Sequence, residues 1–172
     1  CYSLMAHSTE EEVARDFICF GGADVVIIVC DATCMERSLN LVLQTLEITS
    51  QVVVCVNLMD EAEKKKIQIN LRALAERLGV PVVGTSARSR KGLDQLMDAV
   101  TQITENPSQR QFKIHYPDYL EAAISKLEPC VEQVCEEGLD SRWLSLMLLH
   151  WDHNMPGFIE QNLKNNFLGF AL

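Results

Sequence analysis

The sequence predicts an α/β fold, with a three-stranded parallel sheet and its helices in residues 1–108 and a small all-helical subdomain in residues 112–172. The first observation is a set of three short apolar blocks at residues 24–31, 51–57 and 80–87. They are rich in Val and Ile without polar alternation, which is typical of strands buried on both faces of a parallel sheet. The second is that helical patterns separate them, and this alternation predicts right-handed crossovers with helices on both faces.

Residues 10–20 are predicted to form the first helix, ahead of the first strand. Either Ser8 or Thr9 can act as its N-cap, and the three Glu that follow lie in the first turn, where negative charge is favourable. Val13, Ala14, Phe17 and Phe20 lie on one face of this helix. This spacing is typical of an amphipathic helix.

Three more helices are predicted in the same half of the chain, at residues 35–48, 71–78 and 92–103. Each has apolar residues at helical spacing. The second also has clear end signals, because Asn70 precedes it as an N-cap and Gly79 follows it as a C-terminal stop. These helices supply the connections that a parallel sheet requires.

The character of the chain changes after a polar connector at residues 104–111. Helices are predicted at residues 116–138 and 140–152, and a third at residues 157–172. The second of these contains an apolar cluster that we interpret as helix-packing core. Its members are Trp143, Leu144, Leu146 and Met147.

Composition indicates a soluble chain and disfavours several functions. The formal net charge is −9, which repels nucleic-acid backbones and anionic lipid, so no nucleic-acid partner is expected. No run approaches the roughly 18 apolar residues that a membrane helix needs, and the first residues have neither the basic start nor the apolar centre of a signal peptide. Three of the seven cysteines, Cys19, Cys30 and Cys55, lie in apolar runs, which suits a reducing compartment.

Polar residues follow the three strands at the points where the strands end. Asp31 ends the first, residues 57–60 follow the second and residues 85–87 follow the third. Ligands of parallel α/β sheets bind beyond the carboxyl ends of the strands, and these ends share one edge. We therefore expect the three segments to meet at one rim of the sheet.

The segment N-L-M-D at residues 57–60 and the segment T-S-A at residues 85–87 match a design that recognises guanine. An ionised Asp60 can accept from the adjacent N1 and N2 donors of guanine, whereas adenine has an acceptor at N1. Asn57 would brace the loops and reach N7, the Ala87 N–H would donate to O6, and Ser86 would hold its loop. The alternative is purely structural, because N-x-x-D is common and Asp60 can act as the N-cap of the following helix.

The sequence also resembles a known family, the cytosolic GTPase portion of bacterial ferrous iron transport protein B. The segments that carry the resemblance occur in the family's order over nearly the whole chain, and the pair "ERSLNLVLQ" and "NLMDEAEKK" is far more specific than any general GTPase signature. The quoted segments are "YSL", "EEVARDFI", "DATCMERSLNLVLQTLE", "VNLMDEAEKKKIQI", "LAERLGVPVVGTSARSRKGLDQL" and "RWLSLMLL".

The resemblance implies a partial P-loop GTPase-like sheet that binds the guanine base of GTP or GDP. The implied base-contacting residues are Asn57, Leu58, Met59, Asp60, Thr85, Ser86 and Ala87. Leu58 stands where most small GTPases carry a Lys over the base, which implies looser and faster-exchanging nucleotide. Tyr2, Ser3 and Leu4 would be the remnant of the second switch.

The resemblance further implies GTP hydrolysis with Mg²⁺ in the complete protein, coupled to Fe²⁺ uptake. The expected partner is a membrane permease region of the same polypeptide, which places this portion at the cytoplasmic face of the bacterial inner membrane. Two alternatives remain open. One is a regulatory or interaction module without turnover, and the other is a different small GTPase family with a generic N-x-x-D loop.

Two motifs of a complete GTPase are missing from the sequence. There is no G-x-x-x-x-G-K-[ST] phosphate loop, and the switch Asp of the family would fall immediately before Cys1. We therefore expect a fragment that lacks its N-terminal half, contains no catalytic residue and is inactive alone. The strand at residues 24–31 would then have an unpaired edge.

Metal binding is not predicted. His150 and His153 lie three residues apart but have no firm third ligand. Cys130 and Cys135 do not align on a helix as ligands should, so we interpret these thiols as packing residues.

Overall fold

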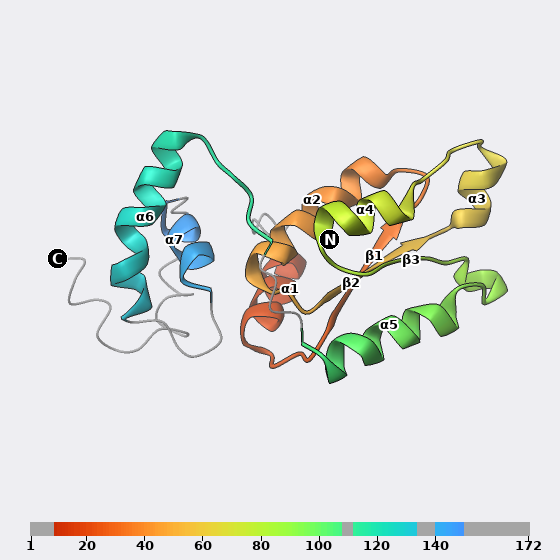
Figure 1. Cartoon of the computed structure of the whole chain (residues 1–172), viewed down its shortest axis with the longest axis horizontal. Helices are drawn as coiled ribbons and strands as arrows, with labels where there is room; N and C mark the ends of the chain where they lie inside the picture. Colours follow the sequence, from red (N-terminus) through yellow and green to blue (C-terminus); the bar gives the residue numbers. More distant parts are fainter. Residues whose placement is uncertain (1–8, 108–111, 134–139, 150–172) are drawn as a thin grey trace. The chain divides into compact units, whose positions relative to one another are not determined.

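The computed structural model describes residues 9–107, 112–133 and 140–149. The chain forms two compact units, residues 1–113 and residues 114–172, shown in Figure 1. Within the described residues, no helix is both long enough and apolar enough to cross a membrane.

The first unit contains the predicted three-stranded parallel sheet. Its strands are β1 (Val26–Asp31), β2 (Val52–Asn57) and β3 (Val82–Gly84), in the order β1-β2-β3. β1 and β2 pair along their whole length, so their last residues lie side by side. β3 is shorter than the predicted block because the chain leaves the ladder after Gly84 and turns toward the start of the next helix.

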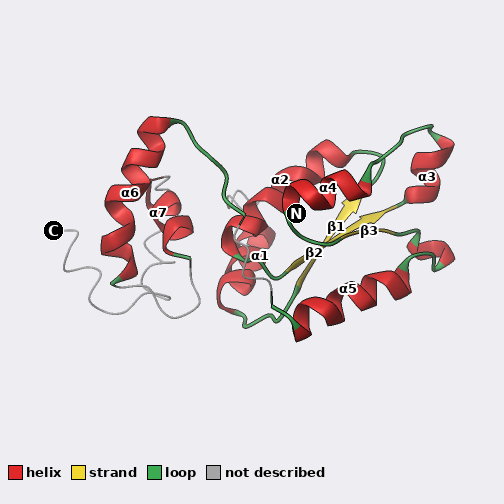
Figure 2. Cartoon of the chain, viewed as in Figure 1, coloured by secondary structure: helices red, strands yellow, loops and turns green. Residues whose placement is uncertain are grey.

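Both faces of β2 are buried because helices cover the two sides of the sheet, as Figure 2 shows. Val52, Val54 and Val56 face a core with α2 (Met35–Ile48) and α4 (Leu71–Leu78). Val53 faces the other side, where it packs with Ala99 and Ile103 of α5 (Leu93–Glu105). This double coverage explains the unbroken apolar run in the sequence.

The ends of α4 form as predicted. The Asn70 side chain accepts a hydrogen bond from the Ala73 N–H at 2.9 Å, which satisfies one of the free donors of the first turn. Gly79 ends the helix in the left-handed conformation, with φ +73°.

β1 and α1 (Thr9–Phe20) leave apolar side chains exposed. Among the described residues β1 pairs only with β2, and Ile27 and Val29 on one of its faces are 41% and 62% exposed. Val13 and Phe17 of α1 are also exposed. Ala14 and Phe20 on the same face are half-buried, so the described part of the chain covers this face only in part.

The second unit contains two described helices, α6 (Asp118–Glu132) and α7 (Ser141–Leu149). Both are shorter than predicted, and the third predicted helix at residues 157–172 lies outside the described residues. Trp143, Leu144 and Met147 are buried, which confirms their interpretation as packing core. Ile124 and Val131 of α6 are buried in the same unit.

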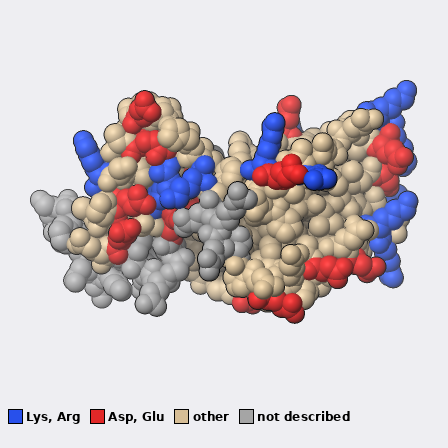
Figure 3. All heavy atoms as spheres, in the orientation of Figure 1, with Lys and Arg blue, Asp and Glu red and all other residues tan. Residues whose placement is uncertain are grey.

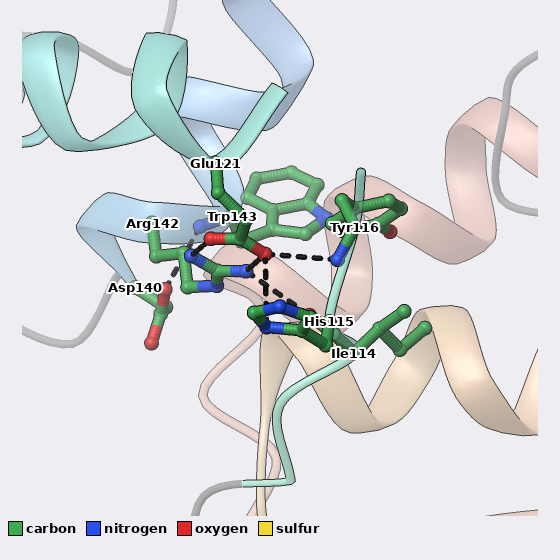
Figure 4. Close-up of polar contacts among 7 residues, drawn as sticks. All are labelled: Ile114, His115, Tyr116, Glu121, Asp140, Arg142 and Trp143. Atoms are coloured by element: carbon green, nitrogen blue, oxygen red, sulfur yellow. Dashed lines mark hydrogen bonds and ion pairs between the residues drawn. The ribbon is translucent and has the colours of Figure 1, made fainter. Parts of the chain in front are cut away.

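One ion pair joins α6, α7 and the segment that enters α6 (Figure 4). The Glu121 carboxylate accepts two bonds from the Arg142 guanidinium, at 2.7 and 2.9 Å, and a third from the Tyr116 N–H at 2.9 Å. Arg142 also donates to the Ile114 carbonyl at 3.0 Å. Hydrogen bonds from Arg142, and then from the Tyr116 N–H, lower the pKa of Glu121 to about 2.

This depressed pKa predicts a specific dependence of stability on pH. Because the folded pKa of Glu121 lies below its ordinary value of 4.5, its contribution is fully present above about pH 5 and is lost as the pH falls through 2. A Glu121→Gln variant should therefore be less stable than the wild type at pH 7, with a difference that shrinks toward nothing near pH 2. Urea unfolding followed by circular dichroism at several pH values measures this difference.

The matched control is Glu132→Gln on the same helix, because Glu132 is exposed and makes no ion pair within the described part of the chain. If Glu121→Gln and Glu132→Gln give the same pH profile, the ion pair does not stabilise this unit.

Candidate functional site

The first predicted loop begins where β2 ends, at the rim of the sheet. The strand ends at Asn57, Leu58 turns the chain with φ +63°, and α3 (Met59–Lys64) begins at the next residue. Asp60 therefore lies in the first turn of α3, and Leu58 occupies the N-cap position. The alternative interpretation of Asp60 as an N-cap is wrong, because the N-cap is Leu58 and the helix starts two residues earlier than that interpretation requires.

The Ser86 side chain is hydrogen-bonded to Asp60 and favours the ionised form of its carboxylate. The Ser86 Oγ accepts from the Asp60 N–H at 3.1 Å, and Ser86 is buried at the end of β3. A hydrogen bond from the Ser86 side chain is the main reason that the pKa of Asp60 lies below its ordinary value, and the backbone N–H groups of Asp60 and Glu61 add to it. The carboxylate is thus ionised at neutral pH, and Asp60 is half-buried at the rim.

Asn57 joins the two predicted loops. Its Oδ1 accepts from the Thr85 hydroxyl and from the Ala87 N–H, both at 3.1 Å. The Ala87 N–H, which was predicted to donate to a base, therefore donates to Asn57 in this structure. None of the described residues accepts a hydrogen bond from the Asn57 Nδ2, which leaves this donor available to a ligand.

Thr85 points inward. It is 1% exposed, and its hydroxyl lies 3.2 Å from the buried Cys55 thiol as well as donating to Asn57. The Thr85 carbonyl accepts from the Met59 N–H at 3.1 Å. Thr85 therefore braces the two loops against each other through both its backbone and its side chain.

The second loop closes on itself before α5. Ser86 and Lys91 pair through their backbones, at 3.0 and 3.3 Å, around the short helix η1 (Ala87–Ser89). Gly92 follows with φ +77°, and a Cβ at this position would lie 2.2 Å from the Gly84 carbonyl oxygen. Only glycine fits this close approach of the chain to the end of β3. The sequence pattern gave no sign of this contact.

Asp31 also lies at the rim, next to Asn57 in the register of the sheet. Its carboxylate accepts from the Thr33 N–H at 2.7 Å, and this bond is the main reason that its pKa lies below the ordinary value. Asp31 therefore closes the turn after β1. The three segments expected at the rim do meet there.

A cavity of about 710 Å³ opens beside Asp60. It lies between the segment after α3 and the end of β3. Its lining residues are Met59, Asp60, Glu63, Lys66, Ile67, Gln68, Ile69, Gly84, Thr85, Ser86 and Lys91.

Several predicted positions lie outside the described residues. They are Tyr2, Ser3 and Leu4 of the proposed switch remnant, and His150 and His153. Among the described residues no three His, Cys, Asp or Glu side chains group together as metal ligands.

A parallel α/β sheet that brings an N-x-x-D loop and a T-S-A loop together at its carboxyl edge places this chain in the GTPase class of α/β proteins. Comparison with known families identifies the particular group. The family model described as "Ferrous iron transport protein B" matches residues 1–100, and the one described as "FeoB cytosolic helical domain" matches residues 116–167. The chain belongs to the ferrous iron transport protein B family.

Relatives and solved structures agree with this assignment. The chain is 32% identical over 97% of its length to a Fe(2+) transport protein A/Fe(2+) transporter FeoB fusion protein of Porphyromonas gingivalis, and 33% identical over 84% to the Fe(2+) transporter FeoB of Salmonella typhimurium. It spans 20% and 18% of the length of these two relatives.

Two solved structures show the same fold. The cytosolic domain of the T. maritima FeoB iron transporter in its GDP form II gives a TM-score of 0.83 at 31% identity, over 94% of this chain and 62% of that one. An mGMPPNP-bound NFeoB from S. thermophilus gives 0.78 at 32% identity, over 95% and 59%. These similarities confirm the predicted α/β sheet with a helical subdomain.

Proposed function

We propose that the rim of the first unit reads the guanine base of GTP or GDP. The observation that carries this proposal is the ionised carboxylate of Asp60, which is half-buried at the rim and hydrogen-bonded to the buried Ser86. A fixed anionic acceptor matches the two adjacent N–H donors of guanine and is repelled by the acceptor that adenine has at N1. The nucleotide-bound states of the similar FeoB structures support the same ligand.

The remaining predicted residues have distinct parts in this proposal. The Asn57 Nδ2 donates to N7 of the base, while its Oδ1 keeps the two loops together. The Ala87 N–H can donate to O6 once its hydrogen bond to Asn57 breaks. Base binding would then replace the Asn57 Oδ1 by O6 as the acceptor for this N–H. Leu58 and Met59 supply apolar surface beside the base, and Thr85 braces the site from within.

We further propose that the complete gene product hydrolyses GTP with Mg²⁺ and couples hydrolysis to Fe²⁺ uptake through a membrane permease region of the same polypeptide. The names of the relatives, which are Fe(2+) transporters, support this coupling. No Mg²⁺ ligand is assigned among the described residues, since Mg²⁺ at nucleotide sites is held by only one or two carboxylates together with substrate phosphates.

The test is a hydrolysis and uptake experiment with the full-length gene product. Phosphate release from GTP should require Mg²⁺ and exceed release from ATP, and cells that express the protein should accumulate Fe²⁺ faster than cells without it. An Asn57→Ala variant should lower both rates, because it removes the bond between the loops and the donor to N7. Equal release from GTP and ATP, or uptake without any dependence on Asn57, would refute the coupling.

A further inference from the structure

Six of the fifteen basic residues of this acidic chain lie in two short segments beside the proposed base site. They are Lys64, Lys65, Lys66, Arg88, Arg90 and Lys91, here called the basic rim. Figure 3 shows Lys and Arg gathered at the end of the first unit where α3 and the loop before α5 lie. All six residues are exposed.

Both segments are continuous with the residues that are proposed to read guanine. The first follows Asp60 on α3, and the second follows Ala87 in a loop that Ser86 and Lys91 close through their backbones. Lys66 and Lys91 also line the cavity beside Asp60. The basic rim is therefore fixed to the mouth of the site.

Most of the positive charge in the basic rim is not neutralised locally. Lys64 pairs with Glu61 at 2.7 Å, whereas the other five residues make no ion pair with any described residue. The carboxylates facing the rim are Asp31, which interacts electrostatically with Lys65, and Asp60, Glu61 and Glu63. Six cations against four anions leave a local excess of positive charge on a chain whose net charge is −9.

Two of these cations occupy backbone positions that disfavour side chains. Lys66 has φ +59° and Arg90 has φ +57°, in the left-handed region where glycine fits with less strain. Each residue follows the end of a short helix, α3 or η1, where a left-handed residue is common. Glycine can therefore replace either residue without changing the backbone conformation.

We propose that the basic rim captures the polyphosphate anion of the incoming nucleotide and steers it to the base-reading loops. This inference rests on the proposed function. A chain segment of charge −9 repels a polyanion, and a positive patch at the mouth of the site reverses the field within a Debye length of about 8 Å. Such fields raise association rates by about 10-fold to 1,000-fold, and salt screens them.

The test is stopped-flow association of a fluorescent GDP analogue with the full-length gene product at low and high salt. The double variant Lys66→Gln/Arg90→Gln should lower the association rate constant about tenfold at low salt and flatten its salt dependence. Its dissociation rate constant should stay within about twofold. The control, Arg72→Gln/Arg77→Gln on α4, makes the same change in net charge outside the basic rim and should keep the wild-type association rate.

A second variant guards against misfolding. Lys66→Gly/Arg90→Gly removes the same charges while placing glycine where φ is positive, so the backbone keeps its conformation. Its association rate constant should fall by the same factor as that of Lys66→Gln/Arg90→Gln.

The outcomes separate this inference from the proposed function. If the wild type binds GDP but the rim variants associate as fast as the control, steering is refuted and base reading stands. If the rim variants change only the dissociation rate, the cations hold the bound ligand, which also refutes steering. If the wild type binds no guanine nucleotide, the proposed function fails and steering fails with it.

Discussion

Replacing Asp60 by Asn is expected to exchange a preference for guanine for a preference for xanthine. Xanthine has a carbonyl at C2 in place of the amino group, so an amide can accept from N1–H and donate to that carbonyl. With guanine the amide can satisfy only one of the two donors, and it loses the charge-assisted bonds that are each worth about 1.5–3 kcal/mol. The affinity for GDP should fall by about a hundredfold or more, while the affinity for XDP rises.

Competition titrations with a fluorescent guanine nucleotide measure both affinities in the same experiment. Asp98→Asn is the matched control, because Asp98 is an exposed carboxylate on α5 away from the rim. An Asp60→Asn protein that still prefers GDP to XDP would show that Asp60 does not read the base. Asp60→Ala should weaken both nucleotides, which distinguishes a change of specificity from a general loss of binding.

Replacing Gly92 by Ala is expected to destabilise the first unit by about 3 kcal/mol, within the range of substitutions that create steric overlap. The added Cβ would lie 2.2 Å from the Gly84 carbonyl oxygen and 3.3 Å from the Thr85 Cα, and both are backbone atoms that cannot rotate away. Relief requires the end of β3 to move, which displaces the loop that carries Ser86. The affinity for GDP should therefore fall together with stability.

Gly22 provides the control for this substitution. It also has a positive φ, +64°, but a Cβ there meets no atom within 4 Å. Gly22→Ala should therefore cost only the backbone strain, about 1 kcal/mol. Denaturant unfolding of both variants measures the difference, and equal losses would show that the close approach at Gly92 carries no energy.

The sheet was predictable because its physical signal is local. Two-sided burial of β2 requires an apolar residue at every position, and the sequence shows this pattern directly. The caps of α4 are equally local, since Asn70 and Gly79 act on the turn beside them. The meeting of the loops at one rim followed from the rule that parallel strands share their carboxyl edge.

The hydrogen bonds that join the two loops of the site could not be predicted from the sequence pattern. Asn57 and Ala87 are far apart along the chain, and nothing in their spacing shows that one accepts from the other before a ligand arrives. The inward orientation of Thr85 depends on the thiol of Cys55 in the neighbouring strand. The pair of Glu121 and Arg142 likewise joins two helices through a contact that no local pattern encodes.

The exposed face of α1 has a similar origin. Helical spacing predicts that Val13 and Phe17 share a face, and they do, but spacing cannot say which segment covers that face. The spacing of apolar residues shows which face of α1 is apolar, but it does not show which segment packs against that face.

The central claim, that the rim of this α/β sheet reads guanine through Asp60, is tested most directly by nucleotide competition on the wild-type full-length gene product. A fluorescent GDP analogue is bound first and then displaced by unlabelled GDP or ADP. GDP should displace it at a concentration at least about a hundredfold lower than ADP, because adenine leaves the Asp60 carboxylate unpaired. Displacement by GDP and ADP at the same concentration would contradict the account.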